Sequence, residues 1–169
     1  MQILKYFLLL IILVACSLIG KYLSKKYVLR VTELEEIRNA LNMLESKIKF
    51  TYEPIPEIFK EIAKNTSQNI GQVFYFAKEK MKTKTANIAW EEAVEESKNN
   101  LSKEDKDTLK TLSKLLGQTD VEGQVSQIKI TQKFLETQLK EAQELKEKNE
   151  RLYSKLGTTI GLTIVIILC

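Results

Sequence analysis

The sequence of 169 residues contains no histidine and only two cysteines, Cys16 and Cys169. Zinc sites, histidine-dependent nucleophilic triads and CxxC redox pairs therefore lack the residues that they need. No GxGxxG or GxxxxGK[ST] loop is present to bind a nucleotide phosphate. We therefore expect no enzyme activity, no cofactor or metal and no small-molecule substrate.

Residues that interrupt helices are also scarce, because the chain has only two prolines and six glycines. Glu, Lys, Leu and Gln are abundant, and this composition favours an all-α fold. The net charge of +4 comes from 26 basic and 22 acidic residues. Such a mixed surface has no strong field, so we expect no nucleic-acid partner.

Each end of the chain contains a long run without charged residues. All 22 acidic residues lie between Glu33 and Glu150, and residues 6–20 and 156–169 carry no charge at all. A membrane-crossing helix needs about 20 apolar residues, so these runs are short, although Lys5 can snorkel outward and extend the first. We predict an N-terminal membrane anchor at 1–23, a cytoplasmic helical bundle at 24–155 and a C-terminal membrane segment at 156–169.

A basic cluster formed by Lys21, Lys25, Lys26 and Arg30 follows the first apolar run. Bases beside a membrane helix resist translocation, and each gains about 1 kcal/mol from anionic lipid. This cluster predicts a cytoplasmic bundle in contact with lipid. The alternative is a lipid-anchored extracytoplasmic helical protein, because Leu13-Val14-Ala15-Cys16 resembles a lipoprotein cleavage box.

A GxxxG spacing occurs in the second apolar run. Gly157 and Gly161 are four residues apart, which allows two membrane helices to approach closely. The spacing indicates either a membrane-helix packing site or a pair that merely permits such packing.

The apolar spacing predicts a six-helix antiparallel bundle whose long first and last helices continue into the membrane segments. Leu34, Ile37, Leu41, Leu44 and Ile48 form a heptad seam in a first helix over about 3–50. Pro54 and Pro56 then force a turn, with Pro56 suited to the first position of the next helix. Short helices follow, burying apolar sets at 58, 59 and 62; at 70, 73, 74, 77 and 81; at 90, 93, 94, 97 and 101; and at 109, 112, 115 and 116. A capping box, Thr119-x-x-Glu122, opens the last helix, whose seam runs from Val121 to Leu156.

Two surface features are candidates for binding a partner. Glu91, Glu92, Glu95 and Glu96 form an acidic stripe, which is either a docking surface or an ordinary solvated face. It lies opposite Trp90, which we expect in the core. Tyr75 and Phe76 lie off the apolar stripe of their helix, either packed on a neighbour or exposed for a partner.

Several segments in this order resemble the stage III sporulation protein AB family of endospore-forming bacteria. They include the proline turn Tyr52-Glu53-Pro54-Ile55-Pro56, the segment Ala89-Trp90-Glu91-Glu92-Ala93 and the junction Leu115-Leu116-Gly117-Gln118-Thr119-Asp120. The ending, Lys148-Asn149-Glu150-Arg151-Leu152-Tyr153-Ser154-Lys155-Leu156-Gly157, also matches. With a short anchor and a leading heptad helix, the resemblance covers essentially the whole chain.

This resemblance implies a fold similar to the cytoplasmic domain of the inner-membrane platform proteins of type II secretion and type IV pilus machines. It also implies a place in the outer forespore membrane, on the mother-cell side, within a channel complex between mother cell and forespore. The implied partners are a secretion-ATPase-like protein and other membrane subunits of the same complex. The family has no catalytic residues to carry over to this sequence.

Overall fold

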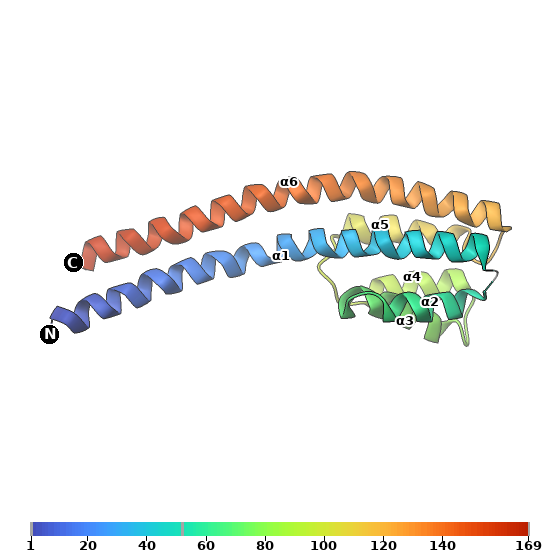
Figure 1. The fold of residues 1–169 in the computed structure, drawn as a ribbon, viewed down its shortest axis with the longest axis horizontal. Helices are drawn as coiled ribbons and strands as arrows, with labels where there is room; N and C mark the ends of the chain where they lie inside the picture. Colours follow the sequence, from blue (N-terminus) through green and yellow to red (C-terminus); the bar gives the residue numbers. More distant parts are fainter. Residues whose placement is uncertain (1, 52, 169) are drawn as a thin grey trace. The chain divides into compact units, whose positions relative to one another are not determined.

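The computed structural model describes residues 2–51 and 53–168, with only the backbone described at 2–10, 12, 13, 16, 17, 154, 157, 161, 167 and 168. These residues form six α-helices and one 3₁₀-helix, and the described chain contains no strand (Figure 1). The helices are α1 (Gln2–Phe50), α2 (Ile55–Lys64), α3 (Gln68–Lys80), α4 (Ala86–Glu96), α5 (Lys103–Lys110), η1 (Thr111–Lys114) and α6 (Val121–Leu168). The predicted all-α fold with long first and last helices is confirmed.

The chain divides into two compact units, and each unit takes part of both long helices. Unit 1 comprises residues 1–29 and 142–169, whereas unit 2 comprises residues 30–141. Unit 1 therefore contains only the outer parts of α1 and α6. Unit 2 contains the inner parts of both helices and all of the short helices.

The heptad seam of α1 forms one side of the core of unit 2. All five predicted seam residues are buried: Leu34, Ile37, Leu41, Leu44 and Ile48. Within unit 2, α1 and α6 run antiparallel, because Asn42 accepts a hydrogen bond from Gln132 (2.9 Å) and Glu45 pairs with Lys129 (3.6 Å). As the residue number rises along α1, its partner's number falls along α6.

Three aromatic rings fill the space between α2, α3 and α4. Phe59, Phe74 and Trp90 are almost completely buried, and their ring centroids lie 5.3–5.4 Å apart. The Trp90 indole donates a hydrogen bond to the Leu109 carbonyl oxygen at 2.8 Å. Trp90 is thus a core residue, as predicted.

The apolar seam of α6 is buried only in part. Within unit 2, Ile128, Leu135 and Leu139 are buried, as are the polar Thr131 and Gln138. In unit 1, the predicted seam residues Leu145, Leu152 and Leu156 are exposed, because no short helix belongs to that unit. The sequence pattern of the seam is therefore longer than its buried part.

Three local boundaries differ from the predicted ones. The fifth helix ends at Lys110, where the Thr111 hydroxyl donates to the Thr108 carbonyl oxygen (2.7 Å) and the chain tightens into the 3₁₀-helix η1. Helix α2 begins at Ile55, which places Pro56 at the second position.

The third boundary is the start of α6, which is capped by Asp120 and not by Thr119. The Asp120 carboxylate accepts from the Gly123 backbone N–H at 2.9 Å. Between η1 and α6, Gly117 has φ 69°, which other residues adopt only with strain.

Candidate functional site

The predicted acidic stripe lies on the outer face of α4. Ala89, Trp90, Ala93 and Val94 bury the inner face of this helix. Because these residues repeat at three- and four-residue spacing, Glu91, Glu92, Glu95 and Glu96 project to the other side. Glu91, Glu95 and Glu96 are exposed and Glu92 is half-buried, so the stripe is accessible within unit 2.

Each carboxylate of the stripe already has a partner in unit 2. Glu92 pairs with Lys80 (3.0 Å) and Lys84 (2.6 Å), and Glu96 also pairs with Lys80 (2.9 Å). Glu95 pairs with Lys110, and Glu91 accepts a hydrogen bond from the Ser113 hydroxyl at 2.6 Å. Exposed ion pairs contribute roughly 0–1 kcal/mol each, so a partner's basic groups could replace these lysines at small cost. Docking at the stripe stays a prediction.

These pairs also shift the acid–base behaviour of the stripe. The pKa of Glu92 is lowered, first by the hydrogen bond from Lys84 and then by that from Lys80. The pKa of Glu95 is lowered chiefly by the hydrogen bond from Lys110. Both carboxylates are therefore held in the charged form that binding to a basic surface requires.

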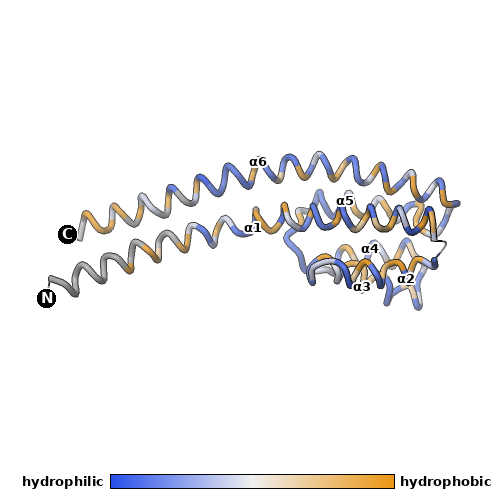
Figure 2. The backbone as a smooth tube through the Cα atoms, in the orientation of Figure 1, coloured by the Kyte–Doolittle hydropathy of each residue, from blue (hydrophilic) through white to orange (hydrophobic). Residues whose placement is uncertain are grey.

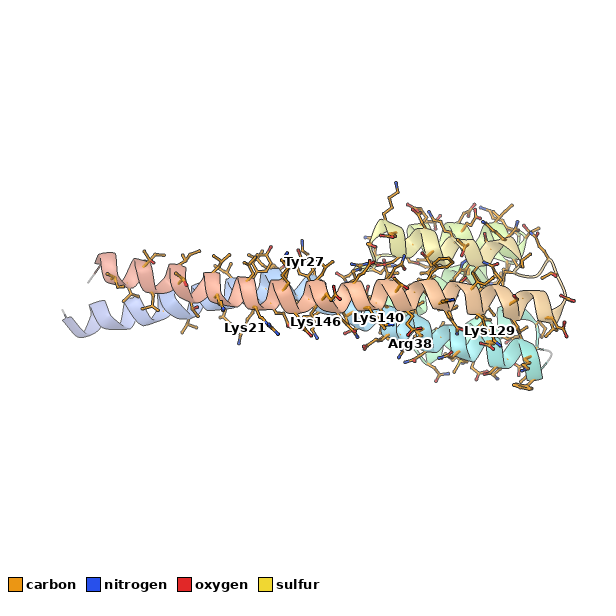
Figure 3. The ribbon with its side chains drawn as sticks, turned by 90° about the horizontal axis from the view of Figure 1, so that it is seen from above. Lys21, Tyr27, Arg38, Lys129, Lys140 and Lys146 are labelled. Atoms are coloured by element: carbon orange, nitrogen blue, oxygen red, sulfur yellow. The ribbon has the colours of Figure 1, made fainter. Side chains whose placement is uncertain are left out.

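The predicted basic cluster is split between the two units. Lys21, Lys25 and Lys26 are exposed on α1 in unit 1, and Lys21 is labelled in Figure 3. Arg30 belongs to unit 2, where its guanidinium forms two hydrogen bonds of 2.8 Å with the Asp105 carboxylate. Arg30 is therefore committed to a salt bridge inside the helical domain, a role that the charge pattern did not predict.

The carboxylate of Asp105 is fully buried and accepts three hydrogen bonds, two of them from Arg30. Besides binding Arg30, it accepts a hydrogen bond from the Ser102 backbone N–H (2.8 Å), which completes a capping box at the start of α5. The pKa of Arg30 is raised, mainly by the hydrogen bond to Asp105. This bidentate pair fixes α1 to the N-terminus of α5.

One turn further along α1, the buried Glu33 makes a second polar contact with the short helices. Its carboxylate accepts hydrogen bonds from the Asn69 side chain (2.7 Å) and from both the backbone (2.6 Å) and the side chain (2.7 Å) of Asn100. Glu33 thus joins α1 to α3 and to the loop before α5, with every donor supplied by a neutral amide.

Two other predicted sites fall on residues whose side-chain environment is not described. Gly157 and Gly161 lie in α6, but the packing at both glycines lies outside the described residues, and so does the side chain of Cys16. Within the described part of the chain, no group of His, Cys, Asp or Glu is arranged to hold a metal ion.

In unit 1, α1 and α6 run side by side in opposite directions. Tyr27 stacks on Tyr153, with ring centroids 6.5 Å apart, and the two chain ends point the same way (Figure 1). Each step from Tyr27 toward the N-terminus is matched by a step from Tyr153 toward the C-terminus. Lys25 of α1 therefore lies at the level of Lys155, the last charged residue of α6.

Beyond this level, both helices carry apolar side chains that remain exposed in unit 1. These side chains are 46–76% exposed: Ile11, Val14, Leu18, Ile19, Tyr22 and Leu23 on α1, and Leu156, Ile160, Leu162 and Ile166 on α6. The C-terminal part of α6 is correspondingly coloured as hydrophobic in Figure 2. Among the residues described, no helix meets the combined length and hydropathy that a membrane span requires.

Comparisons with known proteins give a consistent result. The sequence model of a family described as Stage III sporulation protein AB matches residues 5–169. A curated Stage III sporulation protein AB from Bacillus subtilis (strain 168) is 28% identical over 161 residues, which are 93% of this chain and 94% of the relative. A solved structure of Stage III sporulation protein AB (SpoIIIAB) is similar in fold, with a TM-score of 0.65 and 24% identity. That likeness covers 70% of this chain and 97% of the solved chain.

Proposed function

Because the chain belongs to the stage III sporulation protein AB family, we propose that it is a structural membrane subunit of a secretion-like channel complex in sporulation. In this proposal the complex lies in the outer forespore membrane, between mother cell and forespore, and unit 2 lies in the mother-cell cytoplasm. There unit 2 docks a secretion-ATPase-like partner. The observation that carries the proposal is the paired, exposed apolar surface of unit 1.

In unit 1, the exposed side chains of α1 and α6 change from charged to apolar at nearly the same height along the helix pair. The stack of Tyr27 on Tyr153 places Lys25 opposite Lys155, and Lys21 lies about 6 Å further along α1. Toward the chain ends from there, the described side chains that are large and exposed are apolar. A soluble monomer rarely exposes so large an apolar surface, whereas a lipid bilayer covers one favourably.

The bases at this level suit an anionic membrane surface. Lys21, Lys25 and Lys26 precede Tyr27 on α1, and Arg151 and Lys155 lie two residues to either side of Tyr153 on α6. Arg151 is paired only loosely with Glu147 (3.5 Å). Tyrosine and lysine are typical of the interface between water and lipid. The bases therefore support attachment at a defined depth, with both helices entering together.

Vesicle flotation tests the attachment. We expect the purified full chain to float with vesicles of phosphatidylcholine containing about one-third phosphatidylglycerol. Reversal of three bases, Lys21→Glu, Lys25→Glu and Lys26→Glu, should weaken this binding at least about 100-fold, because each base contributes about 1 kcal/mol at an anionic surface. A matched control, Lys129→Glu, Lys133→Glu and Lys140→Glu, changes the same charge on α6 in unit 2 and should bind normally. If the full chain does not float with these vesicles, the proposed attachment is refuted.

Docking at the acidic stripe is tested separately by pull-down of the proposed secretion-ATPase-like partner. The triple variant Glu91→Lys, Glu92→Lys and Glu95→Lys is expected to retain less than about one-tenth of the partner, since opposed like charges cost several kcal/mol at an interface. The variant Glu122→Lys, Glu136→Lys and Glu144→Lys makes an equal charge change on α6 and should retain it. Equal recovery with both variants would exclude the stripe as the docking surface.

A further inference from the structure

A basic groove runs between α2 and α3 in unit 2, on residues to which no role has been assigned. Its volume is about 470 Å³, and it is open to solvent. The lining residues are Lys60, Ala63 and Lys64 from α2 and Gln68, Gly71, Gln72, Tyr75 and Lys78 from α3. Three of these are lysines and none is a carboxylate.

The small residues Ala63 and Gly71 form the floor of the groove, where α2 and α3 approach closely. A Cβ atom on Gly71 would lie 2.8 Å from the Ala63 carbonyl oxygen and 3.2 Å from the Thr66 hydroxyl, so only glycine fits at this contact. The ring of Tyr75 forms one wall and is 50% exposed. An exposed aromatic ring beside a small-residue floor is a seat for an apolar side chain.

Of the three lysines on the rim of the groove, two are paired with nearby carboxylates and one is not. Lys64 forms no hydrogen bond or salt bridge with the described residues, while Lys60 pairs with Glu57 at 2.9 Å and Lys78 with Glu79 at 2.6 Å. The pKa of Glu57 is lowered by its hydrogen bond with Lys60 and, more weakly, by the charges of Lys78 and Lys64. Lysines from both α2 and α3 therefore favour the charged form of a carboxylate that lies near the groove.

We propose that this groove binds an acidic, amphipathic segment of a partner protein. In this mode, carboxylates of the segment pair with Lys60, Lys64 and Lys78 while an apolar side chain rests on the Tyr75 ring and the floor at Ala63. Gln68 and Gln72 provide amides for hydrogen bonds to the segment's polar groups. The groove thus has the opposite charge to the stripe on α4, so it binds an acidic segment where the stripe would bind a basic surface. This inference rests on the proposed docking role of unit 2 but not on docking at the stripe.

Photo-crosslinking in sporulating cells that express the full chain tests the inference. The photoreactive residue p-benzoylphenylalanine replaces Tyr75 in the groove, and in separate strains it replaces Ile88 on α4 or Ile130 on α6, two side chains of similar exposure. We expect Tyr75 to capture a protein segment in which Asp and Glu outnumber Lys and Arg, as read by mass spectrometry. Adding Lys60→Glu and Lys64→Glu should reduce this product at least tenfold, whereas adding Lys129→Glu and Lys133→Glu should not.

Each other outcome overturns the groove as the binding site. A neutral or basic segment, a lipid adduct, an unchanged yield after charge reversal, or a yield at Tyr75 no higher than at Ile130 would do so. A protein product at Ile88 with none at Tyr75 would refute the groove and leave the docking role of unit 2 in place. No protein product at any of the three positions would contradict both.

Discussion

Replacing Trp90 with alanine is expected to lower the free energy of unfolding by about 3–5 kcal/mol. The indole is only 1% exposed and packs against Phe59 and Phe74 at centroid distances of 5.4 and 5.3 Å. Its removal leaves a cavity where α2, α3 and α4 meet. It also removes the indole N–H that donates a hydrogen bond to the Leu109 carbonyl oxygen. A domain of this size has only about 5–15 kcal/mol of stability, so the variant should be close to unfolding.

Urea denaturation of the full chain in mild detergent, followed by circular dichroism, measures this loss. Trp90→Phe helps to separate the two contributions, because it keeps an aromatic ring in the core but removes the N–H that donates to the Leu109 carbonyl oxygen. We expect it to cost about 1–3 kcal/mol. Ile130→Ala alters an exposed residue of the same unit and should stay within about 0.5 kcal/mol of the native chain. A Trp90→Ala loss below 1 kcal/mol would mean that the three rings do not form the core.

The apolar core of unit 2 could be predicted from the sequence because its side chains follow one helical period. Leu34, Ile37 and Leu41 on α1 and Ile58 and Phe59 on α2 all lie where the spacing places them. Burial on a helix repeats with its turn, so spacing alone identifies the inner face. Helix ends were harder, since they depend on single hydrogen bonds such as that of Asp120 with Gly123.

Polar residues of the core were missed although one signal was present. Arg30 lies four residues before Leu34, which is the spacing of the heptad seam itself. Position around the helix therefore predicted burial, while position along the sequence, close to Lys25 and Lys26, suggested a basic cluster. In the structure Arg30 faces the core, as its seam position indicates, and pairs there with Asp105, which lies 75 residues away in sequence. No local pattern identifies such a partner.

The candidate surfaces were predictable only where one helix forms them. The stripe on α4 could be read from spacing alone, but its lysine partners come from α3, α5 and the intervening turn. The groove between α2 and α3 had no such pattern, because it depends on the close contact of Gly71 with Ala63 across two helices. The sequence left open whether Tyr75 packs on a neighbour or is exposed, and in the structure it is 50% exposed.

Replacing Asp105 with alanine is the second change for which we expect a large loss, about 3–5 kcal/mol of unfolding free energy. The substitution leaves the Arg30 guanidinium, whose side chain is only 15% exposed, without its anion. It also removes the acceptor of the Ser102 backbone N–H at the start of α5. Ser102→Ala removes only the hydroxyl part of this cap, so it should cost about 1 kcal/mol.

A double-mutant cycle decides whether Arg30 acts through Asp105, as its bidentate geometry indicates, or independently at the lipid surface. If the salt bridge is the source of the loss, Arg30→Met combined with Asp105→Ala should be more stable than Asp105→Ala alone, because the unpaired buried charge is gone. The same urea titration in mild detergent gives the coupling energy. Additive losses from the two single substitutions would show that the contribution of Arg30 does not depend on Asp105.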